Sequence, residues 1–284
     1  MKITIEGNSI RAVSPEGQAA QMPLSDFLSA VAPTRMSTCG VVLPHGVKLV
    51  YSRGPVTIWF HETSPRPFNF RWIAADSPVK FGRKTRSRQV RIALPYLIVM
   101  AVFAPGENGV EQLSSSNECF FLNEPITRED QELLYPALLN CSRFMPPEGR
   151  PLSWICTQSL DRSSFVGEGD LNKRLRGGFK ALMKCLVETG FNESSDVHEF
   201  SSWYTESTKV DPRVSTIEKW EEATREDPSF AEKVPWLKTG LTIRAVAERT
   251  FQNIFAHLPG RDGIVSSAGD LARIIFNSKG PSRS

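Results

Sequence analysis

The stretch RIALPYLIVMAVF, from Arg91 to Phe103, is one of the longest apolar runs in this chain of 284 residues. We interpret it as one long strand, which ends at the turn residues from Pro105 to Gly109. The run is shorter than the roughly 20 residues that a helix needs to cross a bilayer. The first residues do not resemble a signal peptide either, because Glu6 and Asn8 interrupt any apolar stretch. We therefore expect a cytoplasmic protein with no membrane partner.

Further strands are predicted on both sides of this run. Turn signals at residues 52–55 and 64–67 separate three strand-like segments that precede it. Because each connection is short, the economical arrangement is an antiparallel meander. Its predicted strands are Val47 to Tyr51, Val56 to His61, Pro67 to Ile73, Arg91 to Phe103 and Glu118 to Leu122.

The two ends of the chain have a different organisation. Strands from Lys2 to Ile5 and from Ser9 to Val13 precede a short helix that begins after Pro23 and stops at Pro33. From residue 168 onward the apolar spacing becomes helical. The predicted helices are a short one from Thr127 to Pro136, one from Asp170 to Thr189 with Leu175, Phe179 and Leu182 on its apolar face, Asp196 to Tyr204, one opened by a capping box from Ser215 to Glu218, Thr242 to Leu258, and one capped by Ser267 to Asp270.

Strands followed by helices predict an α+β fold: an antiparallel β-meander with flanking helices and a helical C-terminal extension. We divide the chain into an N-terminal β/α appendage (1–38), a central α+β domain (41–206) and the helical extension (207–284). The hydrophobic fraction of 40% is ample for a core. The 34 basic and 31 acidic residues are too balanced for a wholly basic nucleic-acid coat protein.

Several common catalytic motifs are absent from the sequence. It has no Walker loop, no GxGxxG after a strand, no GxSxG and no HExxH. We therefore predict no cofactor and no metal site. The five cysteines, at 39, 119, 141, 156 and 185, contain no CxxC pair, so we expect thiols. Each is either a small core residue or a nucleophile.

One stretch, from residue 80 to residue 91, concentrates basic charge. Its six cations would repel one another without an acidic partner, which a nucleic-acid backbone or an acidic protein surface would supply. The alternative is a hairpin whose outward residues are basic and solvated. The candidate binding residues are Lys80, Arg83, Lys84, Arg86, Arg88 and Arg91.

Four short segments carry a resemblance to a known family. They are His61-Glu62-Thr-Ser-Pro65-Arg66, Ala93-Leu94-Pro95-Tyr96, Pro136-Ala-Leu-Leu-Asn140 and Ile155-Cys156. Their order, in a meander followed by an Asn, a Cys and helices, resembles the ubiquitin-conjugating (UBC-like) enzymes. It is closest to the bacterial relatives found beside ThiF-like activating enzymes and JAB-type peptidases. The resemblance covers about residues 41 to 206.

The resemblance implies that Cys156 carries a ubiquitin-like protein as a thioester and that Asn140 stabilises the oxyanion. The implied partners are that ubiquitin-like protein and a ThiF-like activating enzyme. The sequence departs from the family because Tyr135 to Asn140 replaces the usual His-Pro-Asn triplet, and residues 145–151 lengthen the gap to Cys156. Cys141 also lies beside the Asn.

Three functional alternatives stay open at this point. The chain is a conjugating enzyme, a binding module of the same fold without chemistry, or a nucleic-acid-associated protein that acts through residues 80–91. For Cys156 itself the alternative is a buried, inert thiol.

Overall fold

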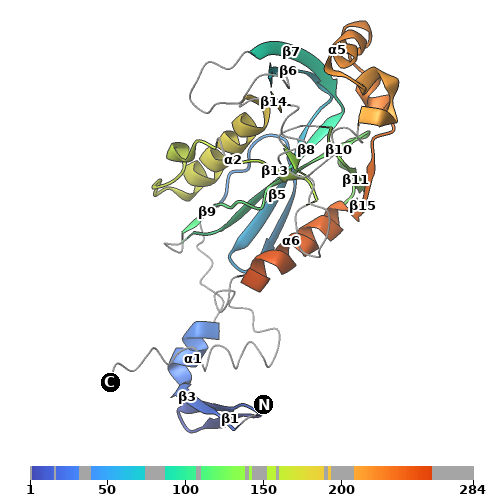
Figure 1. Ribbon diagram of the computed structural model, residues 1–284. Helices are drawn as coiled ribbons and strands as arrows, with labels where there is room; N and C mark the ends of the chain where they lie inside the picture. The colour runs from blue at the N-terminus through green and yellow to red at the C-terminus, as the bar shows by residue number, and fades with distance from the viewer. Residues whose placement is uncertain are drawn as a thin grey trace. The chain divides into compact units, whose positions relative to one another are not determined.

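The computed structural model describes residues 2–15, 17–31, 40–73, 87–106, 110–137, 141–142, 152–157, 160–188, 191–192 and 208–257 (Figure 1). The chain forms two compact units. One comprises Met1–Cys39 with Ile254–Ser284, and the other comprises Gly40–Asn253. None of the described helices is long and apolar enough to cross a membrane.

The first unit contains a small antiparallel meander. Strands β1 (Lys2–Glu6), β2 (Ser9–Val13) and β3 (Ala19–Pro23) pair in that order, and helix α1 (Leu24–Val31) follows directly. β2 and β3 alternate buried and exposed residues, as expected for strands with one face covered. The small core consists of Ile10, Ala12, Ala20, Met22 and Phe27. The sequence predicted β1, β2 and α1 but not β3.

The second unit is built on an antiparallel sheet. Its central strands follow one another in the order β4 (Val47–Arg53), β5 (Val56–Thr63), β8 (Tyr96–Pro105) and β10 (Glu118–Leu122), and all of these neighbours pair antiparallel, as predicted. The predicted place of the strand from Pro67 to Ile73 within this meander is wrong, because that segment continues in line with β5 and belongs to a separate sheet. Beyond β10 the sheet continues with β13 (Trp154–Ile155) and β12 (Cys141–Ser142). β9 (Glu111–Leu113) joins β8, and β11 (Glu132–Leu134) lies between β10 and β15 (Lys238–Thr242).

The predicted single strand from Arg91 to Phe103 is wrong, because Pro95 divides it. β7 (Ser87–Leu94) precedes the break and pairs with β6 (Arg66–Ile73) in a separate sheet, where β14 (Phe191–Asn192) joins β6 in parallel. The register of β5 with β8 continues unchanged into β6 with β7, which places Pro65 opposite Pro95. Neither proline has an N–H to donate, so the ladder is interrupted there.

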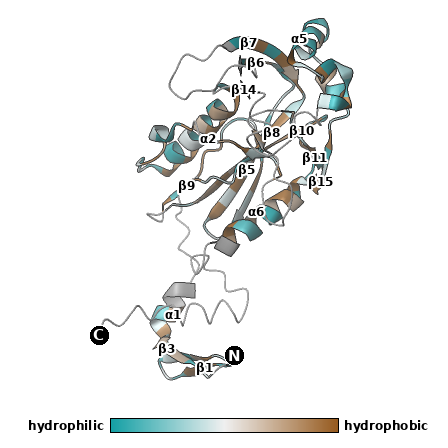
Figure 2. Cartoon of the chain, viewed as in Figure 1, coloured by the Kyte–Doolittle hydropathy of each residue, from teal (hydrophilic) through white to brown (hydrophobic). Residues whose placement is uncertain are grey.

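Two helices cover the opposite faces of the central sheet. On one face, α2 (Leu171–Glu188) packs its predicted apolar side against the strands, with the rings of Phe179 and Trp59 6.2 Å apart. On the other face, α6 (Ile243–His257) contacts the sheet through Thr250, whose Oγ1 lies 3.8 Å from the Met100 sulfur. Figure 2 shows hydrophobic residues along the central strands and mixed colours on the helices. The fold of this unit is therefore α+β with a largely antiparallel sheet between two helices.

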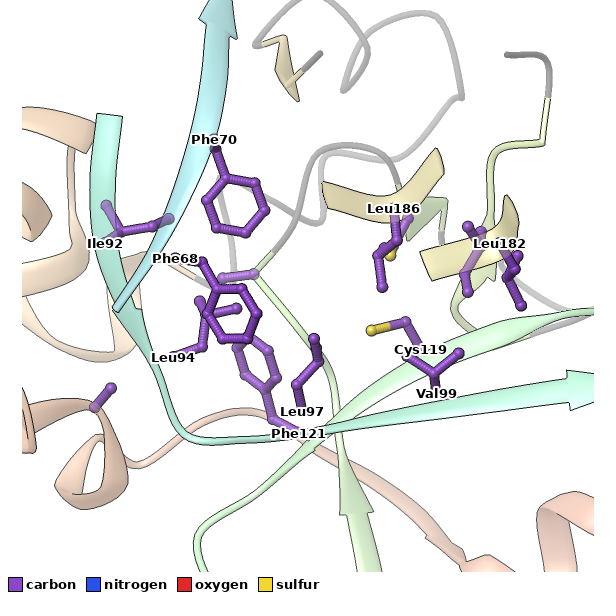
Figure 3. Packing of buried hydrophobic residues seen from close by; sticks show 14 of the residues in the cluster. Phe68, Phe70, Ile92, Leu94, Leu97, Val99, Cys119, Phe121, Leu182 and Leu186 are labelled. Atoms are coloured by element: carbon purple, nitrogen blue, oxygen red, sulfur yellow. The ribbon is translucent and has the colours of Figure 1, made fainter. Parts of the chain in front are cut away.

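The core on the α2 side extends from the central sheet to the β6–β7 hairpin. Figure 3 shows Leu182 and Leu186 of α2 close to Val99 and Cys119 of the sheet. In the same view, Phe68, Phe70, Ile92 and Leu94 of the hairpin lie near Leu97 and Phe121. One continuous cluster of buried side chains thus connects the two sheets.

Helix α5 (Ile217–Glu226) covers the outer edge of β7. The Trp220 Nε1 donates to the Ala93 carbonyl at 2.8 Å, and the Ala93 N–H donates to the Thr224 hydroxyl at 2.8 Å. The Arg91 N–H donates to the Glu221 carboxylate at 3.1 Å. Side chains of the helix thus replace the backbone partners that an edge strand lacks.

Two predicted helical features in this unit are wrong. The N-cap of α5 is Thr216, which accepts from the Lys219 N–H, and not Ser215. The region from Thr127 to Pro136 forms β11 and extended chain instead of a helix. There the Gln131 side chain accepts from the N–H groups of Thr127 and Arg128 and holds them in a turn.

The remaining helical segments are either short 3₁₀ turns or predicted helices that fall outside the described residues. Four 3₁₀ turns are described, at Arg162–Ser164, Thr208–Val210, Pro212–Val214 and Phe230–Lys233. The helices predicted from Asp196 to Tyr204 and after Ser267 lie outside the described residues.

Candidate thiol site

Cys156 lies immediately after β13, and it differs from the other described cysteines in its exposure. Its side chain is partly exposed, whereas Cys119, Cys141 and Cys185 are buried. All four are thiols. An accessible thiol can react with a partner, whereas a buried one in apolar surroundings is inert. The candidate nucleophile is therefore the one cysteine of this described set that a reactant can approach.

The backbone that leads to Cys156 is fixed against the sheet. The Ile155 N–H donates to the Asn117 carbonyl at 2.9 Å, and the Cys119 N–H donates to the Ser153 carbonyl at 3.0 Å. The Trp154 Nε1 donates to the Ser115 carbonyl at 2.6 Å. β13 is thus held through its backbone and through the Trp154 side chain, which constrains the position of the next residue, Cys156.

A buried carboxylate adds to this support. Glu118 is 2% exposed, and its Oε2 accepts from the Leu152 N–H at 2.7 Å and the Ser153 N–H at 3.0 Å. Its Oε1 accepts from the Arg249 guanidinium of α6. Sequence reasoning did not select either residue. A charged residue at the head of the apolar run ECFFL is the signal that could have drawn attention to Glu118, because buried acids are usually paired.

Helix α2 fixes the chain on the other side of Cys156. The Cys185 thiol donates to the Cys156 carbonyl at 3.3 Å. The 3₁₀ turn after Cys156 then lies against the first half of α2, where a Cβ at Gly177 would stand 2.4 Å from the Ser164 carbonyl oxygen. A residue with a side chain does not fit there. The segment that carries Cys156 thus contacts β10 on one side and α2 on the other.

Cys141 is not a competing nucleophile. It lies on β12 opposite Ile155 and is 1% exposed. Burial raises the pKa of the Cys141 thiol well above its ordinary value, and a hydrogen bond with Cys119 raises it further. A thiol that stays protonated reacts slowly. Cys141 is next to the candidate Asn140 in the sequence, but Cys141 is buried whereas Cys156 is partly exposed.

The other predicted site residues are only partly described. Asn140, Lys80, Arg83, Lys84 and Arg86 lie outside the described residues. The distance from Asn140 to Cys156 therefore stays a prediction.

Arg88 and Arg91 lie on β7, and both contact helix α5, Arg88 through its guanidinium and Arg91 through its backbone N–H. The Arg88 guanidinium forms ion pairs with Glu221 and, at 3.0 Å, with Glu218. The hydrogen bond with Glu221 raises the pKa of Arg88 above its ordinary value. The acidic partner that the basic stretch requires is, for this residue, part of the same chain.

The motif residues His61 and Glu62 have structural contacts. The His61 Nε2 lies 3.0 Å from the His45 carbonyl, which only a protonated nitrogen can satisfy, and its buried Nδ1 has no partner among the described residues. Burial lowers the pKa of His61 below its ordinary value. The Glu62 carboxylate, on the other face of the sheet, accepts from the Ile126 N–H and lies 3.5 Å from the Lys48 ammonium. Both residues thus stabilise turns around the sheet.

Within the described part of the chain, no group of three or more His, Cys, Asp or Glu residues could hold a metal ion. The chemistry that these residues offer is that of a supported, partly exposed thiol. Comparisons with protein-family models, curated proteins and solved structures gave no match.

Proposed function

We propose that this chain is a UBC-like protein that carries a ubiquitin-like protein as a thioester on Cys156. The observation that carries the proposal is the position of Cys156: partly exposed, directly after a strand held by the meander, and backed by helix α2. A conjugating thiol has to be reached by a flexible peptide tail, and the buried Cys119, Cys141 and Cys185 do not meet that requirement.

The order of elements supports the same proposal. The strands β4, β5, β8 and β10 form an antiparallel meander, the cysteine segment follows, and α2 then covers one face of the sheet. This is the order expected from the family resemblance of residues 41 to 206. The UBC-like character of the fold rests on that resemblance and is part of the proposal.

The proposed reaction is an exchange of thioesters. The Cys156 thiolate attacks the carbonyl carbon of the ubiquitin-like C-terminus, which arrives as a thioester on the activating enzyme. A new C–S bond to Cys156 forms and the thiolate of the activating enzyme leaves. A substrate amine then attacks the same carbon, and the Cys156 thiolate leaves. In both steps the amide of Asn140 would donate to the transient oxyanion.

The test is a thioester assay with the full chain, a ThiF-like activating enzyme, its ubiquitin-like protein and ATP. The expected result is an adduct that thiols cleave. Cys156→Ser should convert it to a thiol-resistant ester or abolish it, and Cys141→Ser should retain it. If the wild-type chain binds the ubiquitin-like protein without forming an adduct, the enzyme proposal is refuted and a binding module replaces it.

A further inference from the structure

The ion pair between Glu118 and Arg249 joins helix α6 to the segment that carries Cys156. The side chains of Glu118 and Arg249 are 2% and 17% exposed, so both charges are largely removed from water. Removing one partner of such a pair leaves an uncompensated charge in the interior. In this position the Glu118 carboxylate and the Arg249 guanidinium therefore compensate each other's charge.

The carboxylate of Glu118 divides its two oxygens between two elements. One accepts from Arg249, and the other accepts from the N–H groups of Leu152 and Ser153. Hydrogen bonds to an ionised acceptor are shorter and stronger than those to a neutral one. The guanidinium on α6 thus strengthens two backbone bonds that directly precede β13.

These two bonds add to the backbone bonds, the Trp154 bond and the pairing with β12 that hold β13. The strand has only two residues, and its register with β10 is a single pair, Glu118 opposite Trp154. A ladder this short cannot fix the chain by itself, because each backbone hydrogen bond contributes a modest net stabilisation. The side chain of Glu118 extends the ladder backwards to Leu152 and Ser153.

We propose that Arg249 is a positioning residue for Cys156. It acts through Glu118, whose carboxylate holds Leu152 and Ser153 and so keeps the thiol at the end of β13 in place. The role in thioester chemistry rests on the proposed function, but the positioning itself does not. Loss of the guanidinium charge releases the segment and makes the partly exposed thiol more accessible.

The test measures the rate at which iodoacetamide alkylates Cys156 in the reduced full chain, followed residue by residue with peptide mass spectrometry. Arg249→Met should raise this rate at least about tenfold, the factor expected when a charge-assisted hydrogen bond is lost. Arg249→Lys keeps a charged donor and should return the rate to within about threefold of the wild type.

A matched control is a second ion pair that involves helix α6. Arg53 pairs with Glu248 of α6 at 2.8 Å, but on a more exposed surface that does not include Glu118. Arg53→Met should therefore leave the Cys156 rate unchanged. An equal increase in this control, or a rate in Arg249→Met within twofold of the wild type, would overturn the proposal.

Glu118→Gln provides a second variant in case Arg249→Met does not fold. Gln has nearly the same volume but no charge, so it should also raise the Cys156 rate, and an unchanged rate would again refute the positioning role. Because alkylation needs no partner protein, this result is independent of the thioester assay. A wild-type chain without an adduct would refute the proposed function while the alkylation rates still decide the role of Arg249.

Discussion

Substitution of Thr224 by Val tests how helix α5 protects the edge of β7. The Thr224 hydroxyl accepts from the Ala93 N–H at 2.8 Å and donates to the Trp220 carbonyl at 2.7 Å. Thr224 is 4% exposed and Ala93 is fully buried, so water cannot replace the hydroxyl. Val keeps the shape of the side chain and removes the hydroxyl, and with it both the acceptor for the Ala93 N–H and the donor to the Trp220 carbonyl.

The expected cost follows from this geometry. In Thr224→Val the Ala93 N–H becomes a buried donor without a partner, which costs about 1–3 kcal/mol. Thr224→Ser keeps the hydroxyl and loses one methyl group, which costs about 0.8 kcal/mol. The Val variant should therefore be less stable than the Ser variant, although Val preserves the packing volume. In a unit of this size, a loss of 1 kcal/mol lowers the melting temperature by about 2–4 °C.

The assay is urea unfolding followed by tryptophan fluorescence. Trp220 and Trp236 are suitable reporters, because both are buried and their rings lie 5.5 Å apart next to α5. Both variants should keep the slope of the wild-type transition, and the midpoint should fall further for Val than for Ser. If Ser is the less stable of the two, packing decides the stability here and the edge-protection argument is wrong.

Three further predictions concern other parts of the same unit. Gly46 has a φ of +93° and a Cβ there would stand 2.5 Å from the His61 Nε2, so Gly46→Ala should destabilise the protein by more than the roughly 1–2 kcal/mol that left-handed strain alone costs. Gly240→Ala is the control for that strain, because Gly240 has a φ of +76° and nothing within 4 Å of its Cβ position; equal losses of stability in urea unfolding would contradict the contact with His61. Because burial lowers the pKa of His61, the unfolded chain takes up a proton at this residue first as the pH falls, so the stability that neutral His61 contributes should be present above about pH 6.5 and decrease below it. His61→Gln should therefore flatten the dependence of unfolding free energy on pH, and an unchanged dependence would refute the assignment. Arg88→Gln should lower the free energy of unfolding by at most about 1 kcal/mol, because the ion pairs of Arg88 are partly exposed. It should also leave the affinity for RNA in a filter-binding assay at several salt concentrations unchanged, because Glu221 already neutralises the guanidinium; a clear loss of RNA affinity would show that Arg88 is available to a polyanion.

The sequence predicted the elements whose signals are local. The alternation in Val47 to Tyr51 and the helical spacing of Leu175, Phe179 and Leu182 correspond to β4 and α2. The antiparallel pairing of β4 with β5 also follows from their short connection, whereas β5 pairs with β8 although β6 and β7 lie between them in the sequence. Pro95 was visible in the sequence, but its effect depends on Pro65 lying opposite it in the register, and that pairing joins two distant segments.

The support of the candidate site could not be predicted in the same way. Glu118 is recognisable as a charged residue in an apolar strand, yet its partner Arg249 lies on the helix that covers the opposite side of the sheet from α2. Helical spacing identifies which face of α6 is apolar, but it does not indicate which strand a buried arginine meets. The exposure of Cys156 has the same origin, because it depends on where β13 ends relative to α2.

The basic stretch shows most directly what a charge pattern can and cannot reveal. The density of cations up to Arg91 predicted an acidic partner or a solvated hairpin, without indicating which. For Arg88 that partner is the pair Glu218 and Glu221, which are far away in the sequence and arrive with α5. Since α5 also satisfies the edge of β7 through Thr224 and Trp220, the ion pairs and the edge bonds form one contact surface. For Arg88, then, neutralisation by α5 removes the electrostatic reason to require a nucleic acid.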